Sequence, residues 1–173
     1  MNITAFEVIP YNIPFVTPLQ TAGKTYTHRE GVWLQLKSGE FTGIGEAAPL
    51  EGFSKETKKE VHYALEGFHQ AIEGESFDND ELFSLMEVHT EDTPSARFAL
   101  ESAVYDLLSK DAGVPLCKYL NSKAKPEIAV NGLVGLHLPV DGFKVMKVKV
   151  GFRNLFNEIE NMETLTQFFG DDI

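Results

Sequence analysis

The chain has 173 residues, and its 15 lysines and arginines against 26 aspartates and glutamates give a formal net charge of −11, which argues against a nucleic-acid-binding protein. Its aromatic content of 13 Phe, 5 Tyr and 1 Trp is enough for a packed core and argues against disorder. One cysteine excludes a disulfide scaffold, and since neither a signal peptide nor an apolar run of roughly 20 residues is visible, we expect a cytoplasmic protein without a membrane partner.

The first third of the chain predicts a three-stranded antiparallel sheet. Residues 2–13 are rich in β-branched and aromatic side chains, and residues 30–37 alternate between apolar and polar positions. The pair Ser38-Gly39 favours a tight turn into a return strand over residues 40–47. Residues 14–29 are polar at their centre and are expected to form a long loop, and long loops of compact domains often serve as functional lids.

Helices are predicted next. One spans about 55–73 with Ser54 as its N-cap, and a second spans about 79–89 behind a capping box of Asp78 and Glu81. A third opens with Pro94 at its first position. Gly113 stops this helix, and one or two further turns are expected over 115–121. The expected inward faces of the first and third helices are Val61, Ala64, Leu65, Phe68, Ala71 and Ile72, and Phe98, Leu100, Ala103, Val104, Leu107 and Leu108.

The pattern changes after Lys123. Residues 128–136 and 143–150 are apolar stretches typical of parallel strands buried on both faces, and residues 154–169 predict an amphipathic helix. A strand, a link, a strand and a helix begin a β/α series. We therefore expect an α+β unit over 1–123 and the start of an α/β unit over 124–173.

Lys147 and Lys149 are the strongest candidates for chemistry. They lie two positions apart in a predicted strand, and the period of two places both on one side. Two close ammonium groups in an interior lower each other's pKa, and a lysine tuned toward neutrality is a competent general base. The alternative is that both face water at the end of a strand, as most lysines do.

The other candidates have structural interpretations at least as good as functional ones. Glu46 is either catalytic or a structural carboxylate at a strand end, and Arg29 is either a surface residue or an anion clamp beside a lid. Cys117 is expected to be a small buried hydrophobe rather than a nucleophile. The five histidines, His28, His62, His69, His89 and His137, show no zinc-ligand spacing and are expected to be solvated or packed.

Three stretches together resemble the enolase superfamily. They are residues 27–36 with 43–54 (THREGVWLQL, GIGEAAPLEGFS), residues 94–107 (PSARFALESAVYDL), and residues 130–135 with 147–151 (VNGLVG, KVKVG). Their order resembles the muconate-cycloisomerase subgroup, and the first and third are most similar to the o-succinylbenzoate synthase family of menaquinone biosynthesis. The resemblance implies an α+β capping domain, consisting of a three-stranded antiparallel sheet plus helices, followed by the first strands of an incomplete TIM-like (β/α) barrel.

The resemblance also implies site residues. Lys149 would take the proton α to a carboxylate, and Lys147 would lower the pKa of Lys149 and stabilise the enediolate, beside Mg²⁺ in full-length members. Two cap loops, over about 14–27 and 48–54, would close on the substrate. They would offer four residues for its recognition, Leu19, Thr21, Leu50 and Phe53.

The sequence departs from that pattern in two ways. The residues after Ala124 are far fewer than the roughly 250 that a TIM barrel needs, so the acidic Mg²⁺ ligands and the second catalytic lysine of the family are not expected here. We therefore expect this chain to bind no metal ion. Only residues 136–141 separate the first two predicted barrel strands, too few for a helix, so these strands are not expected to pair in parallel without distortion.

The leading hypothesis is the N-terminal part of an o-succinylbenzoate-synthase-like lyase, which carries out a syn-dehydration of a small-molecule carboxylate and is inactive as this chain alone. Within the superfamily, a dipeptide epimerase, an N-acylamino-acid racemase or a muconate-type cycloisomerase is the alternative. From another class, the alternative is a non-catalytic, truncated cap-domain protein. Uncovered barrel strands would favour a homo-oligomer or aggregation.

Overall fold

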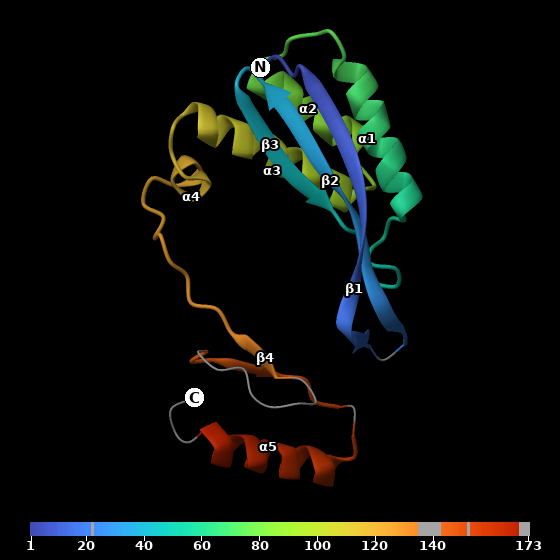
Figure 1. Ribbon diagram of the computed structural model, residues 1–173, viewed down its shortest axis with the longest axis vertical. Coiled ribbons are helices and arrows are strands. Elements are labelled where there is room, and N and C mark those ends of the chain that lie inside the picture. The colour runs from blue at the N-terminus through green and yellow to red at the C-terminus, as the bar shows by residue number, and fades with distance from the viewer. Residues whose placement is uncertain (22, 135–142, 152, 170–173) are drawn as a thin grey trace. The chain divides into compact units, whose positions relative to one another are not determined.

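The computed structural model describes residues 1–21, 23–134, 143–151 and 153–169, in two compact units, Met1–Ala124 and Lys125–Ile173 (Figure 1). The expected change of pattern at residues 123 and 124 lies one residue before this division. The part of the chain expected to lack the first barrel helix, residues 136–141, lies outside the described residues.

The first unit is built on the predicted three-stranded antiparallel sheet, in the order β1 (Ala5–Gln20), β2 (Thr25–Ser38) and β3 (Phe41–Ala47). Gly39 makes the turn between β2 and β3 at a φ of 57°, which favours glycine. The expected long loop over 14–29 is wrong, because β1 and β2 continue as a paired ribbon to Gln20 and Thr25, with a register shift between Pro14 and Leu19. The prolines of β1 are tolerated because it is an edge strand.

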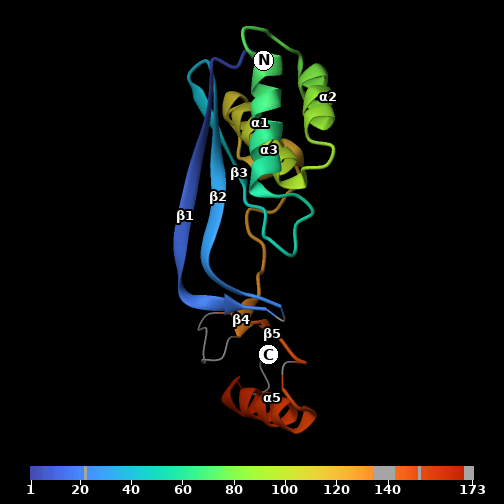
Figure 2. The same cartoon turned by 90° about the vertical axis from the view of Figure 1, so that its right-hand side faces the viewer.

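Four helices follow in the described part of this unit, α1 (Lys58–Ile72), α2 (Asn79–His89), α3 (Pro94–Asp111) and the short α4 (Leu116–Leu120). Of these, α1, α2 and α3 lie on the same side of the sheet (Figure 2). The capping box of Asp78 and Glu81 and the first-turn position of Pro94 are confirmed. The predicted cap of the first helix is wrong: Thr57 and Glu60 form a full capping box there, so α1 begins three residues later than expected.

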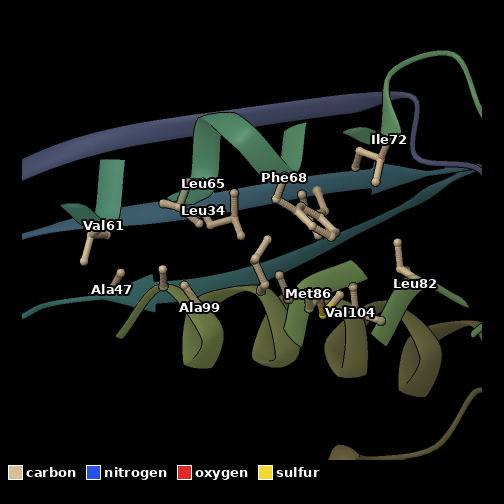
Figure 3. Close-up of a cluster of buried hydrophobic side chains, with 14 of the residues drawn as sticks. Leu34, Ala47, Val61, Leu65, Phe68, Ile72, Leu82, Met86, Ala99 and Val104 are labelled. Carbon is tan, nitrogen blue, oxygen red and sulfur yellow. The ribbon is translucent and has the colours of Figure 1, made fainter. Parts of the chain in front are cut away.

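The core lies between the sheet and the helices (Figure 3). Apolar side chains recur along one face of α1 and meet those of the sheet and of α3. The fully buried set comprises Leu34, Leu36, Ala47, Val61, Leu65, Phe68, Ile72, Leu82, Met86, Ala96, Ala99, Leu100, Ala103, Val104 and Leu107. Two expectations about burial are wrong. Phe98 is 63% exposed because it lies on the outer side of α3, and Cys117 is exposed on α4, which buries none of its residues.

The backbones of α3 and β3 approach each other closely. A Cβ atom added to Gly43 would lie 2.0 Å from the carbonyl oxygen of Ala103, and one added to Gly45 would lie 1.9 Å from that of Ala99. Small residues on both elements therefore allow the helix to rest directly on the strand. This close contact fixes the distance between α3 and β3.

The second unit contains β4 (Gly132–Val134), β5 (Met146–Val148) and α5 (Leu155–Phe169). Although we expected no parallel pairing without distortion, Gly132, Leu133 and Val134 do pair in parallel with Met146, Lys147 and Val148. Both strands are shorter than predicted, so the connection between them is longer than the six residues expected. The expected burial on both faces is also wrong in this unit, where Leu133, Val145 and Val150 are exposed.

Candidate functional site

The turn that follows β3 has a tight internal geometry. The carbonyl oxygen of Leu50 accepts hydrogen bonds from the backbone N–H groups of Phe53 (2.9 Å) and Ser54 (2.8 Å). The Ser54 hydroxyl in turn accepts one from the N–H of Leu50 (2.9 Å), so Ser54 closes this turn rather than capping α1. Gly52 takes a φ of 87°, a conformation that other residues rarely adopt. The turn presents Phe53 at its surface, 68% exposed.

The end of the β1–β2 ribbon is fastened to this turn. Lys24 forms an ion pair with the Glu51 carboxylate, and the buried Tyr26 donates its hydroxyl hydrogen to the Glu51 carbonyl oxygen. Thr21 and Lys24 are joined by a backbone hydrogen bond and by two contacts through the Thr21 hydroxyl. The two segments expected to recognise substrate therefore meet at Glu51.

The four candidate recognition residues lie on these two segments. Leu19 is half-buried in β1 opposite Tyr26, and Thr21 stands just beyond the end of β1. Leu50 and Phe53 belong to the turn itself. The structure joins the segments through Glu51 and Tyr26, while the contact of these four side chains with a substrate stays a prediction.

Arg29 has a role that the sequence interpretation missed. Its guanidinium is half-buried and donates hydrogen bonds to the carbonyl oxygens of Ala48 and of Pro49, the latter at 3.4 Å. It therefore fastens the beginning of the turn to β2. Neither the expected surface position nor the anion-clamp alternative includes this contact with backbone oxygens.

Charge in this region is paired. The hydrogen bond to Glu51 raises the pKa of Lys24, and the same bond lowers the pKa of the Glu51 carboxyl. A second ion pair, between Lys58 and Glu30, lowers the pKa of Glu30. All four groups are exposed, so salt screens these pairs and their energetic contribution is small.

Glu46 is held by the sheet. Its carboxylate accepts the hydroxyl hydrogen of Tyr11 from β1, across the central strand β2. Burial together with that bond raises the pKa of Tyr11 to about 12. The carboxylate of Glu46 is therefore engaged in a structural bond, which supports the structural interpretation of this residue.

Lys147 and Lys149 lie in the second unit. Lys147 is in β5, and Lys149 follows the last residue of that strand. Both are exposed, whereas Met146, which precedes them, and Val148, which lies between them, are half-buried. This alternation is that of an extended strand and places both ammonium groups on one side, as the period of two predicts. Their catalytic role stays a prediction.

The described residues offer no alternative centre. Among residues 1–21, 23–134, 143–151 and 153–169, no group of three or more His, Cys, Asp or Glu side chains could hold a metal ion. His69 stacks on Phe6 with ring centroids 4.5 Å apart, and His89 meets the Phe68 ring edge-on at 6.3 Å. His137 lies outside the described residues. No helix in the described part of the chain is long and apolar enough to cross a membrane.

Comparison with known proteins gives consistent matches. The family described as "MenC, N-terminal domain" matches residues 3–107. An L-Lys-D/L-Arg epimerase from Desulforapulum autotrophicum is 27% identical over 190 residues, covering 100% of this chain and 52% of the relative. An o-succinylbenzoate synthase from Yersinia enterocolitica is 32% identical over 148 residues, covering 82% of this chain and 40% of the relative.

The fold is shared with solved structures as well. The dipeptide epimerase from Enterococcus faecalis V583, solved with Mg and the dipeptide L-Leu-L-Tyr, has a TM-score of 0.83 at 24% identity, covering 100% of this chain and 52% of that one. The chain therefore spans about half the length of the curated relatives it matches.

Proposed function

Because this chain belongs to the family of the MenC N-terminal domain, the capping domain of enolase-superfamily enzymes of the muconate-cycloisomerase subgroup, we propose that it forms the cap and the first barrel strands of an o-succinylbenzoate-synthase-like lyase. The observation that carries the proposal is the family match over residues 3–107, which includes both segments that meet at Glu51. The o-succinylbenzoate synthase relative at 32% identity supports the same reaction.

The proposed reaction is the removal of water from a cyclohexadiene carboxylate. A base takes the proton α to the carboxylate and, once protonated, gives a proton to the ring hydroxyl, which leaves as water. The product is the aromatic o-succinylbenzoate. Lys149 is the proposed base, and an amine accepts a proton only when it is itself unprotonated. In this proposal Lys147, exposed on the same side of the strand as Lys149, offers positive charge to the enediolate.

Metal ions have no site among the described residues, where carboxylates, histidines and cysteines do not cluster. The Mg of the Enterococcus faecalis dipeptide epimerase therefore has no counterpart in the part of the chain that the structure describes. What this chain contributes to the proposed reaction is the base strand and the cap segments. We expect the chain by itself to be inactive.

A dipeptide epimerase is the second candidate. It is favoured by the epimerase relative that matches the whole chain and by the fold shared with a solved dipeptide epimerase. Both reactions start by abstraction of the proton α to a carboxylate. They differ in the next step, which is loss of a hydroxyl group in one and return of a proton to the opposite face in the other.

The base assignment is testable in a hybrid that joins residues 1–151 of this chain to the remaining barrel of the Yersinia enterocolitica enzyme. Lys149→Ala should lower its turnover by about a hundredfold or more and leave its melting temperature unchanged. Lys144→Ala, at an exposed lysine just before β5, is the matched control and should retain activity. Equal activity of both variants would refute the assignment. A folded hybrid without any activity would favour the non-catalytic cap-domain protein instead.

A further inference from the structure

Three donors from one strand and its tip converge on a single turn. Arg29, in β2, donates to the carbonyl oxygens of Ala48 and Pro49. Tyr26, three residues earlier in the same strand, donates to that of Glu51. Lys24, just before β2, pairs with the Glu51 side chain. All but the last of these contacts bind backbone rather than side-chain oxygens, so they fix the path of the turn whatever its side chains are.

The arginine contact is unusual in its choice of partner. A guanidinium has five donors in a rigid plane and commonly binds a carboxylate with two of them. Here the half-buried group instead spans two consecutive neutral carbonyl oxygens. Hydrogen bonds from a charged donor are stronger than those between neutral groups. The geometry therefore suits Arg29 to holding a backbone segment.

Tyr26 reinforces the attachment of the turn to β2 through its bond to the Glu51 carbonyl oxygen. Only 8% of the residue is exposed, and the Lys24 ammonium lies 5.4 Å from the centre of its ring. A Cβ atom at Gly52 would lie 3.6 Å from the Tyr26 hydroxyl, so the turn packs directly on this side chain. Yet neither Tyr26 nor Arg29 belongs to the cluster that forms the main core.

We propose that Arg29 and Tyr26 are positioning residues for the turn at Leu50 to Ser54. The bond from the buried Tyr26 to the Glu51 carbonyl oxygen, more than the exposed Lys24–Glu51 ion pair, couples this turn to the ribbon end, so that the two segments loosen together as one body. That this body shapes the substrate site rests on the proposed function, whereas the coupling itself does not. Coupling between two segments is reciprocal, so loosening either one must loosen the other.

Hydrogen exchange of the intact chain tests the coupling. The backbone N–H groups of Leu50, Phe53 and Ser54 report on the turn, and those of Thr21 and Lys24 report on the ribbon end. Arg29→Gln should speed exchange at the turn by about tenfold or more. It should also speed exchange at Thr21 and Lys24, which Arg29 does not touch, while the β2–β3 ladder stays as slow as in the unchanged chain.

Three comparisons make the test decisive. Arg97→Gln, which removes an arginine bound to Glu87 and Glu101 on the helices, should leave both segments unchanged. Arg29→Lys should restore part of the protection, since a lysine reaches one carbonyl oxygen where the guanidinium spans two. If Arg29→Gln fails to fold, Tyr26→Phe takes its place as the test variant. It keeps the ring, removes only the hydroxyl, and should speed exchange at the same two segments.

Two results would overturn the proposal. Faster exchange at the turn without any change at Thr21 and Lys24 would show that the segments are independent. A uniform rise across the sheet would show that Arg29 and Tyr26 merely stabilise the whole unit. Exchange is measured without substrate, so it tests the coupling independently of the reaction. If the two segments prove coupled while the hybrid enzyme shows no o-succinylbenzoate synthase activity, only the proposed function is refuted.

Discussion

Replacing Gly45 with alanine should strongly destabilise the first unit, because the new methyl group has no space. Its Cβ would lie 1.9 Å from the carbonyl oxygen of Ala99 and 2.7 Å from the carbonyl carbon. Real Cβ atoms essentially never lie closer than 3.0 Å to another atom, so α3 would have to move away from β3 by about 1 Å or more. That shift would loosen the contacts of the core residues on the same helix.

The loss in the free energy of unfolding depends on which atoms the new methyl group would contact. Overpacking a core costs about 1–3 kcal/mol, and the upper end applies here because the obstacle is helix backbone rather than a flexible side chain. Loss of chain entropy in the unfolded state returns only about 0.4–1 kcal/mol. We expect a net loss of about 2 kcal/mol or more in the free energy of unfolding, and a melting temperature lower by roughly 4–8 °C.

Urea unfolding followed by circular dichroism measures this loss. Gly23→Ala is the matched control, since a Cβ atom there meets nothing within 4 Å, and the control should unfold at the same urea concentration or a slightly higher one. A Gly45→Ala chain within about 0.5 kcal/mol of the unchanged chain would refute the close contact between α3 and β3.

Three further predictions concern single polar groups. Thr57→Ala removes the capping box of α1 and should lower the free energy of unfolding by about 1 kcal/mol, measured by urea unfolding; no loss would contradict the cap. Thr93→Val should raise the melting temperature, since the buried Thr93 hydroxyl has no hydrogen-bond partner among the described residues and makes no cap contact; a fall would show an unrecognised partner. Burial opposes ionisation of Glu56, but hydrogen bonds from Ser95 outweigh it and hold the pKa of Glu56 below its ordinary value of 4.5. This contribution to stability is complete above that value and is lost as the pH falls through the lowered one, so between about pH 6 and pH 3 the unchanged chain should lose more stability than Glu56→Gln, and parallel losses would contradict it.

Local signals predicted most of the first unit. Alternating apolar residues in β2, the turn at Gly39 and the capping box of Asp78 gave the sheet and the helices in the right order. The capping error was avoidable, because Thr57 has a glutamate three residues later and Ser54 does not. Only the internal pattern of each segment was needed for these features.

Features that depend on tertiary neighbours were missed. The prolines of β1 indicated a strand end, and only the position of β1 at the sheet edge explains why the ribbon continues. The role of Arg29 depends on two carbonyl oxygens about twenty positions away, and no local periodicity reports such a contact. The length of the β4–β5 connection depended on strand ends, which are the least certain part of a sequence-based assignment.

Product formation by a cap hybrid tests the central proposal most directly. Residues 1–124 of this chain would replace the cap of the Yersinia enterocolitica o-succinylbenzoate synthase, whose own barrel supplies the rest of the reaction. The hybrid would be given the cyclohexadiene carboxylate and, separately, an L,L-dipeptide. We predict that it forms o-succinylbenzoate faster than it epimerises the dipeptide. A folded hybrid that epimerises the dipeptide but forms no o-succinylbenzoate would contradict the proposed function.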